Sequence, residues 1–241
     1  MWEFVDQFVC IHFDARTDRG AIMAKFFQEG RIPPEKITQF PAIYHTVGAV
    51  GATKSHISVL ELAKRRGWKN VVILEDDIQW IDPIDTLYPQ FETIQFQSWD
   101  VCMLGGGYLE IKPPNRITTA ISAYSYMVRS HYYDTLLSNF REGLRRRLDK
   151  PGRQPPFISF AYSEAVRTDG KYALDIFWIR LQRQDTWIGL DVCQHVPTFS
   201  DVGQTDSMVD SNNIFTLATY SKNTEHREYM LKWINNWNVL Q

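Results

Sequence analysis

Residues 71 to 77 read Val-Val-Ile-Leu-Glu-Asp-Asp, four apolar residues followed at once by three carboxylates. The length and β-branched content of the apolar part predict a buried strand of the kind found in parallel sheets. Glu75, Asp76 and Asp77 then fall at the carboxyl end of that strand, which is where open α/β sheets bind their ligands. The stretch therefore predicts a mainly parallel sheet and a site at its edge.

The segments around this stretch alternate between strand and helix patterns. The helix over residues 48–66 is framed by Gly48 and Gly67 and carries His56 on its inward-facing stripe. Alternation of this kind indicates an α/β fold with a mainly parallel central sheet flanked by helices, and we expect residues 1–241 to form a single domain. Strands are predicted over residues 4–13, 37–43, 71–74, 100–104, 118–128 and 187–192, and helices over residues 21–27, 48–66, 130–147 and 226–237.

Composition narrows the class of protein. A net charge of -2 and a pI near 6.3 give no field that would attract a nucleic-acid backbone, so nucleic acid is not an expected partner. The three cysteines are far apart and form no C-x-x-C pair, so reduced and buried thiols are expected. The N-terminal residues lack the basic region of a signal peptide, and no apolar run reaches the ~18 residues of a membrane span. We therefore expect a cytoplasmic protein without a transmembrane segment.

One local basic run departs from this balance. Its arginines and lysines predict either the solvated end of a surface helix or a weak contact with an anionic membrane surface or a phosphate-bearing acceptor. The residues are Arg141, Arg145, Arg146, Arg147, Lys150 and Arg153.

The three adjacent carboxylates need a positive partner, because like charges at the end of a buried strand repel one another and are costly to desolvate. Mn²⁺ or Mg²⁺ is the simplest partner, since both ions prefer hard oxygen ligands. Side chains alternate along a strand, so Glu75 and Asp77 should lie on one side and Asp76 on the other. We expect Asp77 to ligate the metal and Glu75 to approach a ribose or support the site. A solvated acidic turn is the alternative.

Two motifs in this part of the chain resemble a known family. Gly51-Ala-Thr-Lys-Ser-His56, a helix, and then Val72-Ile-Leu-Glu-Asp-Asp77 are similar to the pattern of glycosyltransferase family 25, which includes lipopolysaccharide-type and collagen galactosyltransferases. The resemblance extends over roughly residues 5 to 205 and is strongest over 48 to 77. Weaker pieces are the loop from Phe13 to Arg19, Trp99 to Val101 with Leu104-Gly105, Leu174-Asp175, and Ser200-Asp201-Val202-Gly203.

The resemblance implies a GT-A type nucleotide-binding sandwich. It also implies metal-dependent, inverting transfer of a sugar from a nucleotide-sugar donor, with UDP-sugar expected, to a hydroxyl of a glycan or glycoconjugate. Asp77 would then hold the metal beside the diphosphate leaving group, and Asp175 would take the acceptor's proton as general base. The residues expected to bind the donor are Asp14, Arg16, Arg19, Ser55, His56, Glu75 and Asp76.

Several of these roles have a structural alternative. Asp175 is equally suited to cap a helix, and His56 to pack in the core. His195 is expected either to complete the metal shell or to serve as a structural hydrogen-bonding residue. Arg16 and Arg19 suit bidentate contacts with phosphate and equally well surface ion pairs. The glycines at 105–107 are expected to let backbone approach a sugar closely.

Two other functions stay open from the sequence. One is a non-catalytic module of the same fold that binds a nucleotide sugar or glycan. The other is a metal-dependent phosphohydrolase, which the lack of a nucleophile motif beside the carboxylates disfavours. The transferred sugar, the acceptor and the oligomeric state are not determined by these patterns.

Overall fold

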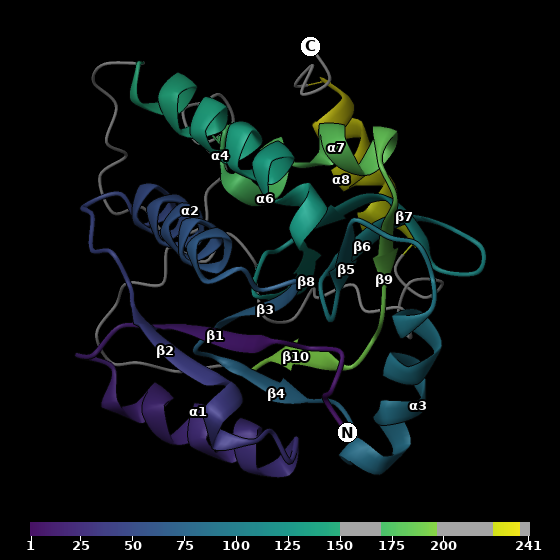
Figure 1. Ribbon diagram of the computed structural model, residues 1–241. Coiled ribbons are helices and arrows are strands. Elements are labelled where there is room, and N and C mark those ends of the chain that lie inside the picture. Colours follow the sequence, from purple (N-terminus) through teal and green to yellow (C-terminus); the bar gives the residue numbers. More distant parts are fainter. Residues whose placement is uncertain (150–169, 197–223, 237–241) are drawn as a thin grey trace.

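The computed structural model describes residues 1–149, 170–196 and 224–236 (Figure 1). Its strands are β1 (Gln7–His12), β2 (Ile37–Pro41), β3 (Asn70–Glu75), β4 (Ile78–Trp80), β5 (Val101–Met103), β6 (Gly107–Lys112), β7 (Arg116–Ile121), β8 (Ser125–Arg129), β9 (Trp187–Gly189) and β10 (Cys193–His195). Its helices are α1 (Thr17–Glu29), α2 (Gly48–Arg66), α3 (Ile84–Gln95), α4 (Tyr133–Leu148), α6 (Leu174–Phe177), α7 (Ile179–Gln184) and α8 (Thr224–Asn236).

The strands form one large sheet and one small one. The large sheet has eight strands in the order β2-β1-β3-β8-β5-β9-β7-β6, and β10 pairs with β4 in the small one. β2, β1 and β3 pair in parallel, as do β5 and β9, whereas β8 and β7 run antiparallel to their neighbours. All strands of the large sheet except β7 and β8 therefore point the same way. The predicted α/β fold with a mainly parallel, helix-flanked sheet is confirmed.

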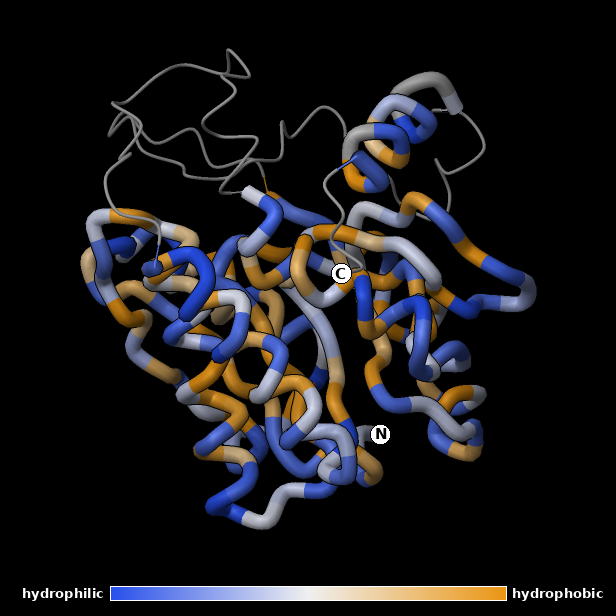
Figure 2. The backbone as a smooth tube through the Cα atoms, turned by 90° about the horizontal axis from the view of Figure 1, so that it is seen from above, coloured by the Kyte–Doolittle hydropathy of each residue, from blue (hydrophilic) through white to orange (hydrophobic). Residues whose placement is uncertain are grey.

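Each face of the large sheet carries its own apolar core. Helices α2, α4 and α6 lie over one face, and α1 and α3 lie on the other, next to β4 and β10 (Figure 1). Orange and blue segments alternate along the helices in Figure 2, because each helix turns an apolar stripe to the sheet and a polar stripe outward. The carboxyl ends of β1 and β3 lie between these two layers.

Most of the predicted elements are present. The helix over 48–66 is α2, and it ends at Gly67, whose left-handed conformation (φ 70°) satisfies the last carbonyls. The single strand predicted over 118–128 is wrong: the chain breaks at Ser122, which has φ 72°, into β7 and β8. These two strands are not neighbours, because β5 and β9 lie between them. The motif Ser200 to Gly203 lies outside the described residues.

Other expectations concern the surface and the thiols. The three cysteines are buried and unbridged, as predicted. Within the described residues, no helix is long and apolar enough to span a bilayer. On α4, Arg141 pairs with Glu61, and Arg145 and Arg146 both pair with Glu142. Lys150 and Arg153 lie outside the described residues, and a weak membrane contact by this basic run stays a prediction, as does a cytoplasmic location.

Candidate functional site

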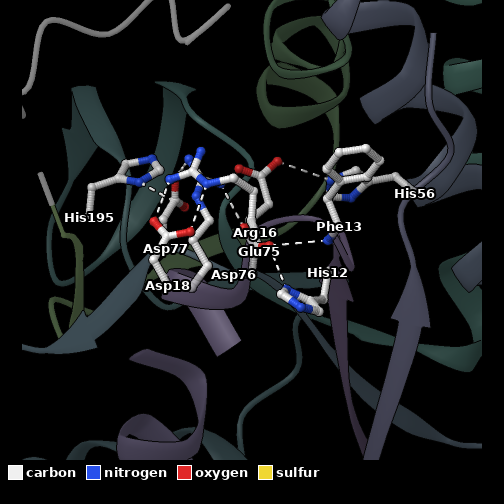
Figure 3. Close-up of polar contacts among 10 residues, drawn as sticks. His12, Phe13, Arg16, Asp18, His56, Glu75, Asp76, Asp77 and His195 are labelled. Atoms are coloured by element: carbon white, nitrogen blue, oxygen red, sulfur yellow. Dashed lines mark hydrogen bonds and ion pairs between the residues drawn. The ribbon is translucent and has the colours of Figure 1, made fainter. Parts of the chain in front are cut away.

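The carboxylates Glu75, Asp76 and Asp77 lie where β3 ends, beside the end of β1. The two strands are parallel and in register, with Ile11 opposite Glu75. This pairing places the loop that follows β1 directly beside the acidic residues (Figure 3). The strand alternation predicts Glu75 and Asp77 on one side, and these two carboxylates do gather with His195. Glu75 also contacts His56, whereas Asp76 contacts the β1 loop.

Asp76 is buried and bound by protein groups on both oxygens. Its Oδ2 accepts from the backbone N–H of Phe13 at 3.2 Å and lies 2.8 Å from Nδ1 of His12, and its Oδ1 accepts from Arg19 at 2.7 Å. The second terminal nitrogen of Arg19 lies 3.0 Å from Oδ2 of Asp77. Asp76 thus fixes the β1 loop and Arg19 in place, and a direct contact between Asp76 and a donor stays a prediction.

Asp77, Glu75 and His195 form a compact group of potential metal ligands. One atom of each lies within 4.8 Å of the others. His195 is carried there by the β10–β4 pairing and by a hydrogen bond from Val196 N–H to the backbone carbonyl of Asp77 (2.7 Å). The structure therefore brings together Asp77 and His195, which lie far apart in the sequence and which the sequence offered as ligands of one metal.

The electrostatics of this group are those of an ion pair. Burial acts to raise the pKa of Asp77, but the adjacent His195 and the charge of Arg19 outweigh it and hold that pKa below its ordinary value. Burial acts to lower the pKa of His195, and Asp77 outweighs it and raises that pKa. Nδ1 of His195 lies 3.2 Å from Oδ1 of Asp77. Each group therefore favours the charged form of the other.

The same group fits a divalent cation. Among the described residues, the buried Oδ1 of Asp77 has its ion-pair contact with His195 but no well-formed hydrogen bond, so it can still accept a cation. Two carboxylates and one imidazole are ligands that Mn²⁺ accepts, whereas Mg²⁺ strongly prefers oxygen. Glu75, Asp77 and His195 are thus the residues that could hold the ion, and metal binding stays a prediction.

The other predicted donor-binding residues lie around this group. His56 is buried on α2, and its Nε2 lies 3.3 Å from Oε1 of Glu75. Ser55 is held by backbone: its hydroxyl donates to the carbonyl of Gly51 (2.9 Å) and accepts from the N–H of Ile43 (2.8 Å). Ser55 therefore fixes the loop after β2 against α2, and its role in donor binding stays a prediction.

The loop after β1 carries two more of the predicted residues. Arg16 forms a two-pronged ion pair with Asp18, at 2.9 and 2.7 Å, which lowers the pKa of Asp18 to about 2. The ion-pair alternative thus describes Arg16 in this structure. Asp14 is exposed at the tip of the loop. Contacts of Arg16 and Asp14 with a donor stay predictions.

Sequence reasoning missed an exposed aromatic pair beside the site. Phe13 follows β1 and Tyr44 follows β2, and their rings stack with centroids 6.2 Å apart. Both residues are exposed, Phe13 by 41% and Tyr44 by 74%. Phe13 is joined to the acidic cluster through its backbone bond to Asp76. Exposed phenylalanines and tyrosines in loops carry no periodic pattern, so only the parallel pairing of β1 and β2 reveals this pair.

Asp175 does not cap a helix. It is the second residue of α6, whose N-cap position is occupied by Ala173 without a side-chain hydrogen bond. Its Oδ2 instead accepts from the backbone N–H of Ser122 at 3.0 Å. Burial and the negative charge of Glu75 raise the pKa of Asp175, and the Ser122 bond only partly offsets them. The capping alternative is wrong, and the general-base role stays a prediction.

The expectation for the three glycines is wrong. A Cβ on Gly105 would lie 2.2 Å from the carbonyl oxygen of Cys193, and one on Gly106 would lie 2.6 Å from the side chain of Met103. Gly107 is equally close to Ile121, at 2.7 Å. The protein's own atoms fill the space that a side chain would need at these three positions. The glycines therefore serve the packing of the protein and do not open a path for a sugar.

Comparisons with known proteins give distant likenesses. No protein-family model matches the chain, and no curated protein matches it significantly. A glycosyltransferase involved in the glycosylation of the major capsid of PBCV-1 is 11% identical, with a TM-score of 0.49, over 92% of this chain and 98% of its own. The A197 protein of STIV is 12% identical, with a TM-score of 0.39, over 79% and 84% of the two chains.

A putative glucose-1-phosphate thymidylyltransferase from Bacillus anthracis is similar to a lesser degree, with 11% identity and a TM-score of 0.35, over 78% of this chain and 69% of its own. Membership of glycosyltransferase family 25 therefore stays a prediction, and the function must be argued from the site's own residues.

Proposed function

We propose that this protein is a GT-A type glycosyltransferase that uses Mn²⁺ to bind a nucleotide-sugar donor, a UDP-sugar by the family resemblance, and transfers the sugar with inversion to a glycan or glycoconjugate hydroxyl. The observation that supports it most is the group of Glu75, Asp77 and His195 at the carboxyl end of β3. A phosphate-bearing ligand suits this place, because ligands of open α/β sheets bind beyond the carboxyl ends of the strands. A bound Mn²⁺ would supply positive charge for the departing diphosphate.

The loop after β1 offers the remaining contacts that a nucleotide needs. Arg19 holds its guanidinium between Asp76 and Asp77, within reach of any phosphate that approaches them. Phe13, whose backbone N–H binds the same Asp76 as Arg19, forms an exposed ring pair with Tyr44, and aromatic faces of this kind stack on nucleobases. A charged group next to a flat apolar one matches the chemistry of a nucleoside diphosphate.

The transfer also needs a base that takes the proton of the acceptor hydroxyl, and we assign this role to Asp175. In an inverting transfer the acceptor oxygen attacks the anomeric carbon, the bond from that carbon to the diphosphate breaks, and the hydroxyl proton passes to the base. A carboxylate with a raised pKa holds such a proton better than an ordinary one. The hydrogen bond from Ser122 N–H to Oδ2 orients Asp175, and Oδ1 is then the atom we assign to the proton.

A panel of UDP-, GDP- and CMP-sugars, tested with and without Mn²⁺, distinguishes this function from the alternatives. We expect Mn²⁺-dependent binding of one donor class and slow release of the free sugar by hydrolysis, both readable by mass spectrometry. Binding without hydrolysis or transfer to any acceptor would favour a non-catalytic module. Release of phosphate from simple phosphate esters would favour a phosphohydrolase, and an absence of donor binding would overturn the proposal.

A further inference from the structure

A buried polar chain leads from the sheet to the acidic cluster. Tyr126 on β8 pairs directly with Ile73 on β3, and Ile73 lies two residues before Glu75. Residues two apart on a strand share a face, so Tyr126 and Glu75 point to the same side of the sheet. That side is covered by α2, which places His56 between them.

Hydrogen bonds join the three residues. The hydroxyl of Tyr126 lies 2.8 Å from Nδ1 of His56, and Nε2 of His56 lies 3.3 Å from Oε1 of Glu75. The two rings are stacked, 13° from parallel, and Phe140 closes the imidazole from another side. His56 and Tyr126 are fully buried, whereas the side chain of Glu75 is 32% exposed. The chain thus runs from the interior to the surface of the site.

The positions of the protons follow from which atoms can donate. Burial raises the pKa of Tyr126 far above its ordinary value, so the phenol keeps its hydrogen. Within the described residues, Nδ1 of His56 is the one acceptor that this hydroxyl has. If Tyr126 donates to Nδ1, the hydrogen of the neutral imidazole is on Nε2 and points at Glu75. The opposite tautomer would leave the phenol hydrogen unused and would set a bare nitrogen against a carboxylate.

We propose that Tyr126 and His56 are positioning residues, which hold Glu75 in one orientation within the cation-binding group by fixing the Nε2–H tautomer of His56. The inference rests on the proposed function, because it assigns a purpose to the orientation of Glu75. A partly exposed glutamate has several rotamers, and a cation gains most from a carboxylate that is already in place. Residues behind metal ligands commonly change metal affinity by about 10–100-fold when they are altered.

Three substitutions separate this role from general packing. Tyr126→Phe removes only the hydroxyl that fixes the tautomer, and we expect Mn²⁺ affinity to fall by about tenfold or more. His56→Gln keeps a donor near the position of Nε2 and should retain most of the affinity. His56→Asn places its donor near the position of Nδ1 instead and should lose as much affinity as Tyr126→Phe. A merely structural role would not order the two amides in this way.

The matched control is Tyr133→Phe. Tyr133 is also buried, and its hydroxyl donates to the backbone carbonyl of Trp68, which precedes β3 at the end opposite to Glu75. The control removes the same atom from the same residue type without touching the cluster. We expect it to leave Mn²⁺ affinity unchanged in isothermal titration calorimetry.

A second readout needs no metal. Nitrogen-15 spectra of histidine side chains distinguish the two tautomers, and the loss of one signal set in His56→Gln assigns His56. We expect the Nε2–H form in the metal-free wild-type protein and a mixture in Tyr126→Phe. An Nδ1–H form in the wild type, or equal Mn²⁺ affinity in folded Tyr126→Phe and wild type, would overturn the inference. No Mn²⁺ binding by the wild type would instead overturn the proposed function, and with it the purpose assigned to Glu75.

Discussion

Two pairs of buried residues, one on each face of the large sheet, satisfy their polar groups differently. On the face covered by α1 and α3, Trp2 and Trp80 each donate from Nε1 to a backbone carbonyl, of Gly30 and of Phe26. On the face covered by α2 and α4, His56 and Tyr126 bond to other side chains, and their chain ends at Glu75. Polar groups that are satisfied by nearby backbone stabilise the fold, whereas a chain of side chains that reaches the strand ends orients a site.

The aromatic cluster under α3 provides the strongest test of this contrast. Phe91 is fully buried and lies edge-on to Trp2 and Trp80, with ring centroids 4.8 and 6.3 Å away. We expect Phe91→Ala to lower the free energy of unfolding by about 3–5 kcal/mol, because it leaves a cavity between rings. Chemical denaturation measures this loss.

The matched control for that change is Phe96→Ala, one residue beyond α3. Phe96 is 87% exposed, so its removal should change the free energy of unfolding by less than about 0.5 kcal/mol.

The Phe91→Ala variant has a second readout. Under conditions in which this variant is still folded, its Mn²⁺ affinity should equal that of the wild type. A loss of Mn²⁺ affinity in folded Phe91→Ala would show that the two faces are not separable in this way.

Asp175→Asn tests a residue of the opposite kind, a buried carboxylate to which we assign a role in the chemistry. We expect turnover to fall by about a hundredfold or more while donor affinity is kept, since the amide cannot take a proton. Steady-state kinetics and donor titration separate these two quantities. Unchanged turnover would exclude Asp175 as the base.

The same variant has a defined effect on the pH dependence of stability. The pKa of Asp175 in the folded protein lies above its ordinary value of 3.8, so the folded state binds more protons than the unfolded state between these two values. The free energy of unfolding contributed by Asp175 is therefore largest below pH 3.8 and falls as the pH rises through the folded pKa. Asp175→Asn should remove this fall and should be no less stable than the wild type at neutral pH. Greater acid stabilisation in the variant would contradict the assignment.

The sequence predicts those parts of the fold that are determined by residues adjacent in the chain. The run from Val71 to Asp77 is local, and it correctly predicted a buried strand with carboxylates at its end. The break at Ser122 was missed because the residues on both sides have strand character and only the backbone conformation separates them. α3 was missed as well, since Pro89 lies inside it and interrupts the helical pattern.

The site shows the same limit. The sequence offered His195 either as a metal ligand beside Asp77 or as a structural hydrogen-bonding residue, and the structure places atoms of the two residues 3.2 Å apart. The contacts of Tyr126 and His12 depend on which strands are neighbours in the sheet, and no short segment of sequence predicts the strand order. The glycines at 105–107 were misread, because a pattern cannot tell whether ligand or protein fills the space beside a glycine.

The central claim is that Asp77, with Glu75 and His195, holds the cation to which the donor's diphosphate binds. Electron paramagnetic resonance of Mn²⁺, titrated with wild-type protein and with Asp77→Asn in the presence and absence of UDP, tests it most directly. We expect the wild type to bind Mn²⁺ and to bind it more tightly with UDP, and we expect the folded variant to show neither effect. Equal Mn²⁺ binding by folded Asp77→Asn and wild type would contradict the account.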